Sequence, residues 1–323
     1  MSSKRRALTL SIGLTAVVYL AGVLLADRHA VLAAFGRLHP ATVLGIFLLS
    51  LLNYLLRFWR WHCYIAALGH RLPRRRHVLY YLAGFILTVT PGKAGEAIRS
   101  LYLFPCGVPY SQSLAALFVE RLLDVLAMSL LALLVLLVRP DYAWLVGVAW
   151  GLALGLIGLV TRPGLPERLR AWGRGHRFSQ QVERLGRLFG ATAVLLRPGL
   201  LLFGLALGVL GWGLEGLALY WSARDMGVPI TLAAGIGVYA IAVLAGALSF
   251  LPGGLGGTEV VMGGLLIAFG ADGATAVAIT LLCRLATLWF AVALGGLAVA
   301  VLGLSGQAPP KAEIPVVPVD YTP

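Results

Sequence analysis

The feature that most constrains this chain is a series of apolar runs that are too long for the core of a soluble domain. The runs cover residues 7–26, 41–68, 113–138, 143–160, 199–220 and 274–304. About 20 helical residues span the roughly 30 Å hydrocarbon core of a bilayer. The chain is 59% apolar and 12% charged, whereas soluble domains hold about 45–50% and about 25%. We therefore expect an all-α polytopic membrane protein.

The two ends of the chain differ from these runs. Lys4, Arg5 and Arg6 precede the first run, as in a secretory signal peptide. The apolar region of a signal peptide holds about 7–15 residues, and this run holds 20, so an uncleaved anchor is expected. Residues 305–323 contain five prolines and few apolar side chains, which predicts a disordered, Pro-rich tail.

Two further apolar regions, residues 78–104 and 230–269, are interrupted by glycine and proline. The first break, residues 91–95, contains Pro91, Gly92 and Gly95, and the second break, residues 252–257, contains Pro252, Gly253, Gly254, Gly256 and Gly257. Neither sequence continues a regular helix. Irregular backbone at membrane depth persists only where protein or a water-filled cavity covers it. We expect two oppositely oriented re-entrant hairpins beside about six full transmembrane helices. The alternative, in which both broken regions span the membrane fully, stays open.

The positions of lysine and arginine predict the orientation. With the N-terminus inside and both broken regions returning to their own side, sixteen basic residues fall inside and four outside. This bias agrees with the positive-inside rule. Eight of the inside arginines lie in the linker 162–197, which is expected to rest on the anionic cytoplasmic leaflet as interfacial helices. The sequence thus predicts a cytoplasmic-membrane protein with both termini cytoplasmic.

The two breaks resemble each other and indicate an internal repeat. Each is followed by a carboxylate that opens an apolar half-helix, Glu96 or Glu259, and later by an intramembrane arginine, Arg121 or Arg284. Inverted repeats with broken half-helices hold substrates near the midplane of many transporters. We expect one transmembrane domain, residues 1–304, with repeat halves at about 41–160 and 198–304. Two simple helix kinks remain the alternative.

Charged residues within apolar runs are candidates for a site, because charge in hydrocarbon is costly. Lys93 and Arg99 flank the expected half-helix start at Glu96, where free N–H groups and two cations favour a phosphate. Thr258 occupies the matching place in the second half-helix. A purely structural ion cluster that pins helices together is the alternative interpretation.

Further charges lie inside single runs. Glu120 and Asp124 share one helix face, and Arg121 is placed to pair with Asp124. Glu215 lies among glycines and serves as a proton carrier, a counter-ion or a protonated, hydrogen-bonded group. The predicted substrate-binding residues are Lys93, Arg99, Arg121, Arg284 and Thr258, and the residues predicted to balance charge or carry protons are Glu96, Glu120, Asp124, Glu215 and Glu259.

Arg57 and Arg60 alternate with Trp59 and Trp61 near the inner end of the second run. Aromatic and basic residues commonly gather at the membrane interface, where long basic side chains reach toward water. This pattern favours an interface anchor, with a lipid-headgroup contact as the alternative.

Soluble catalytic machinery is missing from the sequence. No P-loop, dinucleotide fingerprint, HExxH or GxSxG motif occurs, and the six histidines show no metal-ligand spacing. We expect no catalytic residue, metal or cofactor. The net charge of +13 lies mainly in loops, which indicates a membrane surface as partner and not nucleic acid.

Several ordered motifs are similar to those of a known family. Residues 91–99 resemble a P-x-x-x-G-E-x-x-R motif, residues 120–124 an E-R-x-x-D motif, and residues 252–259 a P-G-G-x-G-x-x-E motif. The element Arg57-x-x-Arg60-Trp61 is also similar. These motifs resemble the lysylphosphatidylglycerol synthase transmembrane-region, or flippase-like, family, and the resemblance covers about residues 7–304.

The resemblance implies a lipid-translocating fold without naming the lipid. Members include the membrane half of the multiple peptide resistance factor, which is associated with moving lysyl-phosphatidylglycerol between leaflets. Others are linked to hopanoid or polyprenyl-glycolipid pathways. In the resistance factor a soluble aminoacyl-transferase domain follows the membrane half, whereas only residues 305–323 follow here, so synthase activity is not expected.

We expect a flippase or transporter for an anionic or phosphate-bearing lipid, such as an aminoacyl-phospholipid or a polyprenyl-linked lipid. Proton coupling stays open, since no nucleotide site is visible. Two alternatives remain: an intramembrane transferase acting on a lipid-linked substrate, and a non-transporting scaffold for a lipid-modifying enzyme. The expected partners are membrane lipids, with anionic headgroups at the basic loops, and a homo-oligomer stays open.

Overall fold

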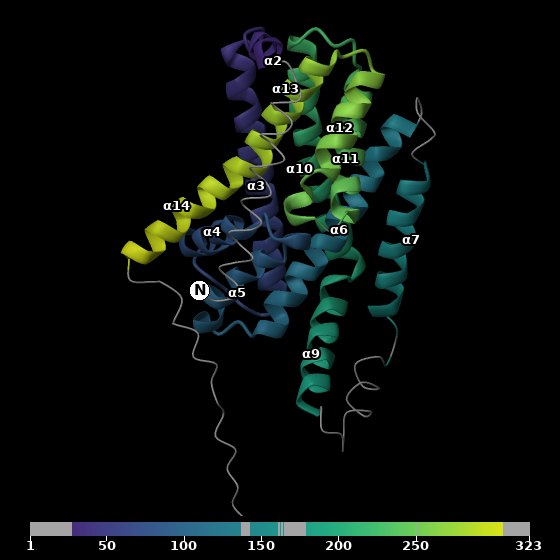
Figure 1. Cartoon of the computed structure of the whole chain (residues 1–323). Coiled ribbons are helices and arrows are strands. Elements are labelled where there is room, and N and C mark those ends of the chain that lie inside the picture. The colour runs from purple at the N-terminus through teal and green to yellow at the C-terminus, as the bar shows by residue number, and fades with distance from the viewer. Residues whose placement is uncertain are drawn as a thin grey trace, which may run out of the picture.

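The computed structural model describes residues 28–136, 143–160, 162, 164, 179–249 and 251–305, and every regular element in these ranges is helical (Figure 1). Before the linker lie α2 (Arg28–Phe35), α3 (Pro40–Ala67), α4 (Arg74–Ala83), α5 (Arg99–Leu103), α6 (Tyr110–Leu136) and α7 (Ala143–Val160). After it come α9 (Ser179–Leu195), α10 (Pro198–Asp225), α11 (Leu232–Leu248), α12 (Gly257–Ala268), α13 (Gly273–Arg284) and α14 (Phe290–Leu304). The expected anchor 7–26, linker residues 165–178 and tail residues 306–323 lie outside the described residues.

Three helical stretches in the described ranges are long and apolar enough to cross a membrane. They are α3 and α10, with 28 residues each, and the 32-residue stretch Gly273–Leu304 that contains α13 and α14. Helix α6 has 27 residues but carries three charged side chains. On these helices Leu48, Leu202 and Leu297 are more than half exposed, which suits contact with hydrocarbon. The expected membrane-helical class is confirmed, while the number of about six spans stays a prediction.

Helix α6 lies at the centre of the fold, between two apolar cores. Its Ala127 and Val135 belong to a core shared with α2, α10, α11, α12 and α13. Its Ala116 and Leu123 belong to a second core shared with α3, α4, α5 and α14. A charged group that α6 carries between these cores is therefore shielded from the surroundings on several sides.

The first break is folded more tightly than the sequence suggested. Helix α4 is followed by two 3₁₀ helices, η1 (Gly84–Leu87) and η2 (Pro91–Ile98), and the α-helix that continues from η2 is the five-residue α5. The expected half-helix at Glu96 is thus 3₁₀-helical up to Ile98 and α-helical only over the single turn of α5. Lys93 has a φ of 56°, the one positive value among described non-glycine residues, and such backbone persists only where its surroundings hold it.

The second break follows the expectation more closely. Helix α11 ends at Leu248, the short η5 (Pro252–Gly254) follows, and α12 starts at Gly257. Gly253, Gly254 and Gly256 have φ values of 63°, 69° and 84°, a left-handed backbone that glycine adopts without steric cost. Helices α11 and α12 pack side by side (Figure 1). At about 1.5 Å per residue, neither spans the hydrocarbon core alone.

The two breaks meet inside the protein, because η2 and η5 contact each other. Val89, just before η2, packs with Leu255 and Leu288. A side-chain carbon added to Gly253 would lie 3.5 Å from the Cα of Val89. Residues of both breaks therefore face one common space.

A π-helical turn, η6 (Leu285–Trp289), joins α13 to α14 directly after Arg284. The Tyr54 hydroxyl of α3 donates to the carbonyl oxygens of Ala286 and Thr287 at 3.1 and 2.9 Å. Turns of this kind widen the helical ladder and recur at functional sites. Helix α14 then runs obliquely across α4 and η1 (Figure 1).

Candidate functional site

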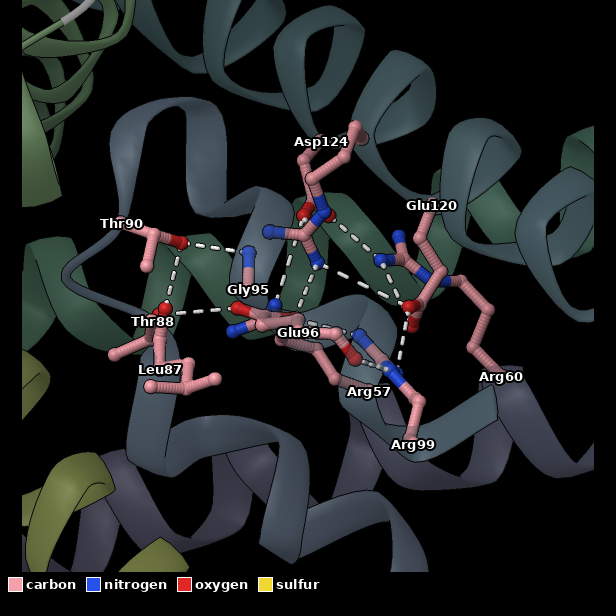
Figure 2. A network of polar contacts seen from close by, with 11 residues as sticks. Arg57, Arg60, Leu87, Thr88, Thr90, Gly95, Glu96, Arg99, Glu120 and Asp124 are labelled. Carbon is pink, nitrogen blue, oxygen red and sulfur yellow. Dashed lines mark hydrogen bonds and ion pairs between the residues drawn. The ribbon is translucent and has the colours of Figure 1, made fainter. Parts of the chain in front are cut away.

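An ion cluster joins α3, the first broken region and α6 (Figure 2). It consists of Arg57 and Arg60 from α3, Glu96 and Arg99 from η2 and α5, and Glu120, Arg121 and Asp124 from α6. The side chains converge from three segments that are distant in the sequence. The cluster therefore fixes the position of the first break against both helices.

Asp124 is the centre of one part of the ion cluster. Its carboxylate lies 2.6 Å from Nη2 of Arg60, 3.2 Å from Nη2 of Arg121 and 3.8 Å from Nη2 of Arg57. The spacing of Arg57 and Arg60 along α3 brings both to the same carboxylate. Asp124 thus holds α3 against α6.

Arg99 is the centre of the other part. Its Nη2 lies 2.6 Å from Oε2 of Glu96, and its Nη1 lies 3.0 Å from Oε2 of Glu120. Its guanidinium carbon stands 4.2 Å from the ring centre of Trp61 and 4.7 Å from that of Tyr81. Paired on two sides and covered by rings, Arg99 has no room for a ligand.

Exposure separates the arginines of the ion cluster into two kinds. The side chains of Arg60 and Arg99 are 0% and 1% exposed, whereas that of Arg121 is 22% exposed. Among the described residues, the Nε atoms of Arg57, Arg60 and Arg121 have no hydrogen-bond partner. Of these three arginines, Arg57 and Arg121 line a cavity. These two arginines therefore keep donors for a further group.

A central cavity of about 240 Å³ lies where the ion cluster meets the two breaks. Its cationic lining is Arg57, Lys93, Arg121 and Arg284, its acidic lining is Asp124 and Glu215, and its apolar lining includes Phe85, Val125, Met128, Trp212, Val243 and Leu288. A mostly apolar pocket with a few convergent polar groups is the usual form of a ligand site. Among the charged groups here, four are cations and two are acids.

Trp212 of α10 forms part of the cavity wall beneath two of these cations. The Arg57 guanidinium carbon lies 5.3 Å from the ring centre, and the Lys93 ammonium lies 5.2 Å from it. An aromatic face attracts a cation by its quadrupole. Trp212 thus holds Arg57 and Lys93 on one side of the cavity.

Arg284, which also lines the cavity, ties α13 to the second break. Its Nε lies 2.7 Å from Oε1 of Glu259, and its Nη2 donates to the carbonyl oxygen of Gly253 at 2.6 Å. Oε2 of Glu259 accepts the N–H of Gly256 at 2.7 Å, so this carboxylate also caps α12. Thr258 is 2% exposed and lines the cavity.

Glu215 of α10 lies in the same cavity wall but in a different setting. The Asn53 amide donates to its Oε1 at 2.6 Å, and the Ser50 hydroxyl donates to its Oε2 at 2.9 Å. Both donors are neutral groups of α3. Glu215 therefore links α10 to α3 through two hydrogen bonds from neutral donors.

Most of the predicted site residues come together, with different roles. Of the predicted substrate-binding residues, Lys93, Arg121, Arg284 and Thr258 line the cavity, and Asp124 and Glu215 lie beside them. Arg99, predicted as a ligand, is sealed in the ion cluster. Glu96 and Glu120 are counter-ions of Arg99, and Glu259 is the counter-ion of Arg284.

The interpretation of Arg57 and Arg60 as interface anchors is wrong. Arg60 is completely buried and Arg57 lines the cavity, because acidic partners on α6 replace the water that an anchor would reach. A signal for this was present in the sequence: Ser50, Asn53, Arg57 and Arg60 recur every three or four residues and so form one polar stripe on α3. Such a stripe in an apolar helix faces the protein interior.

Among the described residues, no group of three or more His, Cys, Asp or Glu side chains is arranged to hold a metal ion. The cavity instead offers guanidinium and ammonium groups, which bind anions. Fold and cavity together define a helical membrane protein with a buried, cation-lined pocket.

The sequence also matches a known family. The model of the "Lysylphosphatidylglycerol synthase TM region" matches residues 7–295, so the chain belongs to this family and is a multi-pass membrane protein. Membership associates it with a lipid-related function in the membrane. The first and second breaks and the ion cluster all lie inside the matched region.

Two archaeal relatives share part of the chain. It is 41% identical over 91 residues to a UPF0104 membrane protein of Methanothermobacter thermautotrophicus, covering 28% of this chain and 27% of that protein. It is 36% identical over 88 residues to a UPF0104 membrane protein of Pyrococcus horikoshii, covering 27% and 26%. The similarity thus spans about a quarter of the length of each relative.

Proposed function

We propose that this protein binds the phosphate-bearing headgroup of an anionic lipid in the central cavity and moves the lipid between leaflets. The observation that carries the proposal is an excess of cations over carboxylates at the cavity. The ion cluster and Lys93 together supply five cations, and the ion cluster supplies three carboxylates. With ordinary ionisation, two positive charges are left at the cavity, apart from Glu215.

An uncompensated charge in a poorly solvated site costs several kcal/mol, roughly, unless a counter-ion arrives. A phosphate group suits this site because guanidinium groups bind its oxygens in pairs. Arg57 and Arg121 keep unused donors, and Lys93 adds a point charge beside them. The apolar lining suits the first carbons of a lipid's glycerol or prenyl portion.

The meeting of the two breaks supports translocation over simple binding. Broken helices that meet near the midplane allow one site to face either leaflet in turn. In this proposal the α11–α12 pair is a re-entrant hairpin from one side and the first broken region is its counterpart from the other. Their contact through Val89, Leu255 and Leu288 is apolar, so the breaks separate without parting a charge pair at that contact.

The basic surface suits the proposed orientation. Arg74, Arg75 and Arg76 at the start of α4 are exposed, and such clusters attract anionic lipid at a cytoplasmic surface. In this orientation both termini are cytoplasmic. In this proposal the same charges concentrate anionic lipid at the cytoplasmic surface of the protein.

Arg121→Ala tests the proposal in proteoliposomes that carry phosphatidylglycerol with a fluorescent headgroup label. Its movement is followed by adding a membrane-impermeant quencher. We expect the protein-dependent rate to fall about tenfold or more, because a hydrogen bond to a charged group contributes about 1.5–3 kcal/mol. Arg224→Ala, which removes an exposed arginine at the end of α10, is the matched control and keeps the rate.

Lys93→Ala is a second variant, with the same expectation, for the case that Arg121→Ala does not fold. Each variant is compared with the parent by thermal unfolding before transport is measured. Equal rates in folded Arg121→Ala, Lys93→Ala and parent protein would contradict the proposal. A covalently altered lipid recovered from the vesicles would favour a transferase instead.

A further inference from the structure

Glu215 is the one acidic residue of the cavity lining that lies outside the ion-pair contacts of the ion cluster. It is 1% exposed on α10, and its two oxygens accept from Asn53 and Ser50. The other acidic lining residue, Asp124, lies within 4 Å of three guanidinium groups. Two carboxylates in one cavity thus have opposite environments.

These environments give the two carboxylates different chemistry. A carboxylate at 2.6 Å from a guanidinium, as in Asp124 and Arg60, is held ionised by its partner. A buried carboxylate that has only neutral donors loses much of its hydration and gains no opposite charge in direct contact, which favours the neutral acid. Proton exchange in the cavity is therefore expected at Glu215 and not at Asp124.

The contacts of Glu215 suit both of its protonation states without rearrangement. The ionised form accepts from the Asn53 amide and the Ser50 hydroxyl, at 2.6 and 2.9 Å. When Oε2 is protonated, the Ser50 hydroxyl turns and accepts a hydrogen bond from the new O–H group, because a hydroxyl is both donor and acceptor. The Asn53 amide keeps its bond to Oε1. A group built in this way gains and loses a proton at little structural cost.

We propose that Glu215 takes up a proton when an anionic headgroup enters the cavity, so that proton and lipid binding are coupled. This rests on the proposed function. Ionised Glu215 repels the anion from the same cavity that Arg57 and Lys93 attract it to. A protonated Glu215 leaves the full cationic excess for the headgroup. Since coupling is reciprocal, anion binding also favours the protonated form.

Charged and titratable groups face the cavity around Glu215 from several elements, among them Arg121 and Asp124 of α6. Tyr54 and Arg57 face it from α3, Lys93 from η2, Tyr239 from α11, and Cys283 and Arg284 from α13. Lys93 is the other group here that exchanges a proton most readily, since arginine stays charged in proteins. A test must therefore separate Glu215 from Lys93.

Calorimetry on the full chain in detergent separates them, with a water-soluble short-chain phosphatidylglycerol as the probe. Its phosphodiester stays singly charged between pH 5 and 9, so any pH dependence comes from the protein. Titration in two buffers that differ in ionisation heat counts the protons taken up for each lipid bound. We expect uptake of up to about one proton and affinity that rises up to about tenfold per unit fall in pH.

Glu215→Gln mimics the protonated acid and keeps both neutral partners. We expect it to bind the probe at high pH as tightly as the parent does at low pH, without proton uptake. Glu183→Gln is the matched control on α9, where the carboxylate is 57% exposed, and it keeps the pH dependence of the parent. Ser50→Ala removes a hydrogen bond that is stronger to the ionised carboxylate than to the neutral acid, so it moves the pH dependence to higher pH.

The outcomes distinguish the two proposals. Binding by the parent without proton uptake, or uptake that persists in Glu215→Gln, would overturn the coupling at Glu215 while leaving the lipid site in place. No binding by the parent at any pH would overturn the lipid site and the coupling with it. If Glu215→Gln does not fold, the proton count of the parent and the shift in Ser50→Ala decide the question.

Discussion

Asp124→Asn is expected to be among the most destabilising single changes in this protein. The substitution keeps the shape of the side chain but removes the charge that lies 2.6 Å from Arg60 and 3.2 Å from Arg121. Arg60 is completely buried, and its remaining acidic partner, Glu120, is 3.8 Å away. Removing one member of a buried pair costs about 3–5 kcal/mol, since the other charge stays buried without its partner.

Arg60→Met is expected to cost less, about 3 kcal/mol at most. Asp124 then still has Arg121 at 3.2 Å and Arg57 at 3.8 Å, and the change lowers the cationic excess, whereas Asp124→Asn raises it. In the double variant both members of the pair are gone. We therefore expect its cost to be about 2 kcal/mol below the sum of the two single costs, within the range seen for residues in contact.

The assay is reversible unfolding in mixed micelles, in which a denaturing detergent is titrated and the helical content is measured. Glu183→Gln is the control, because its pair with Arg187 is more than half exposed on both sides and is expected to contribute about 0.5 kcal/mol or less. Strictly additive costs, or a cost of Asp124→Asn below about 1 kcal/mol, would refute the view that this pair fixes α3 against α6.

Two further predictions concern packing and capping. Gly295→Ala places a methyl group against the backbone N of Ile86 in η1 and 2.8 Å from the carbonyl carbon of Phe85, and should cost about 1–3 kcal/mol. Gly296→Ala has open space and should be neutral or stabilise by up to about 1 kcal/mol. Thermal unfolding compares the two variants. Asp272 caps α13 by accepting from the N–H and hydroxyl of Thr275, which lowers the pKa of its carboxyl, so Asp272→Ala should cost about 1 kcal/mol at neutral pH. This contribution is complete above the ordinary aspartate pKa of about 3.9 and is lost as the pH falls through the lowered folded value, so parent and variant should converge in unfolding measured at about pH 2–3.

The helix breaks were predictable from the sequence because proline and glycine act locally. In the second break three glycines have a left-handed backbone. The run of glycines permits this conformation, but the sequence alone does not show which of the glycines adopt it. The first break was located correctly, yet its 3₁₀ form was not foreseen. Its geometry depends on Lys93 and on the tight approach of Gly95 to Leu87, and such contacts are set by the tertiary fold.

The partners of the charges were less predictable, because ion pairs between helices depend on how the helices pack. Arg121 and Asp124 were expected to pair from their spacing on one helix, and they do at 3.2 Å. Arg99 was expected to bind a ligand, but Trp61 and Tyr81 cover it. Of the two tryptophans that suggested an interface, Trp61 is buried and packs against Arg99.

The arrangement of charges explains how one cavity is both rigid and receptive. Every carboxylate of the ion cluster already has a guanidinium partner. The other cations at the cavity therefore find no unpaired carboxylate in the cluster with which to form an ion pair. Lys93 is held by a strained backbone and by the ring of Trp212, which keeps its ammonium in place. Charge that is preorganised in this way binds an anion without a further free-energy cost for ordering the site. The ion pairs of the cluster hold α3 against α6, whereas the two breaks meet through apolar side chains. We therefore expect the motion during transport to occur at the contact between the breaks. The ion cluster should stay intact during this motion.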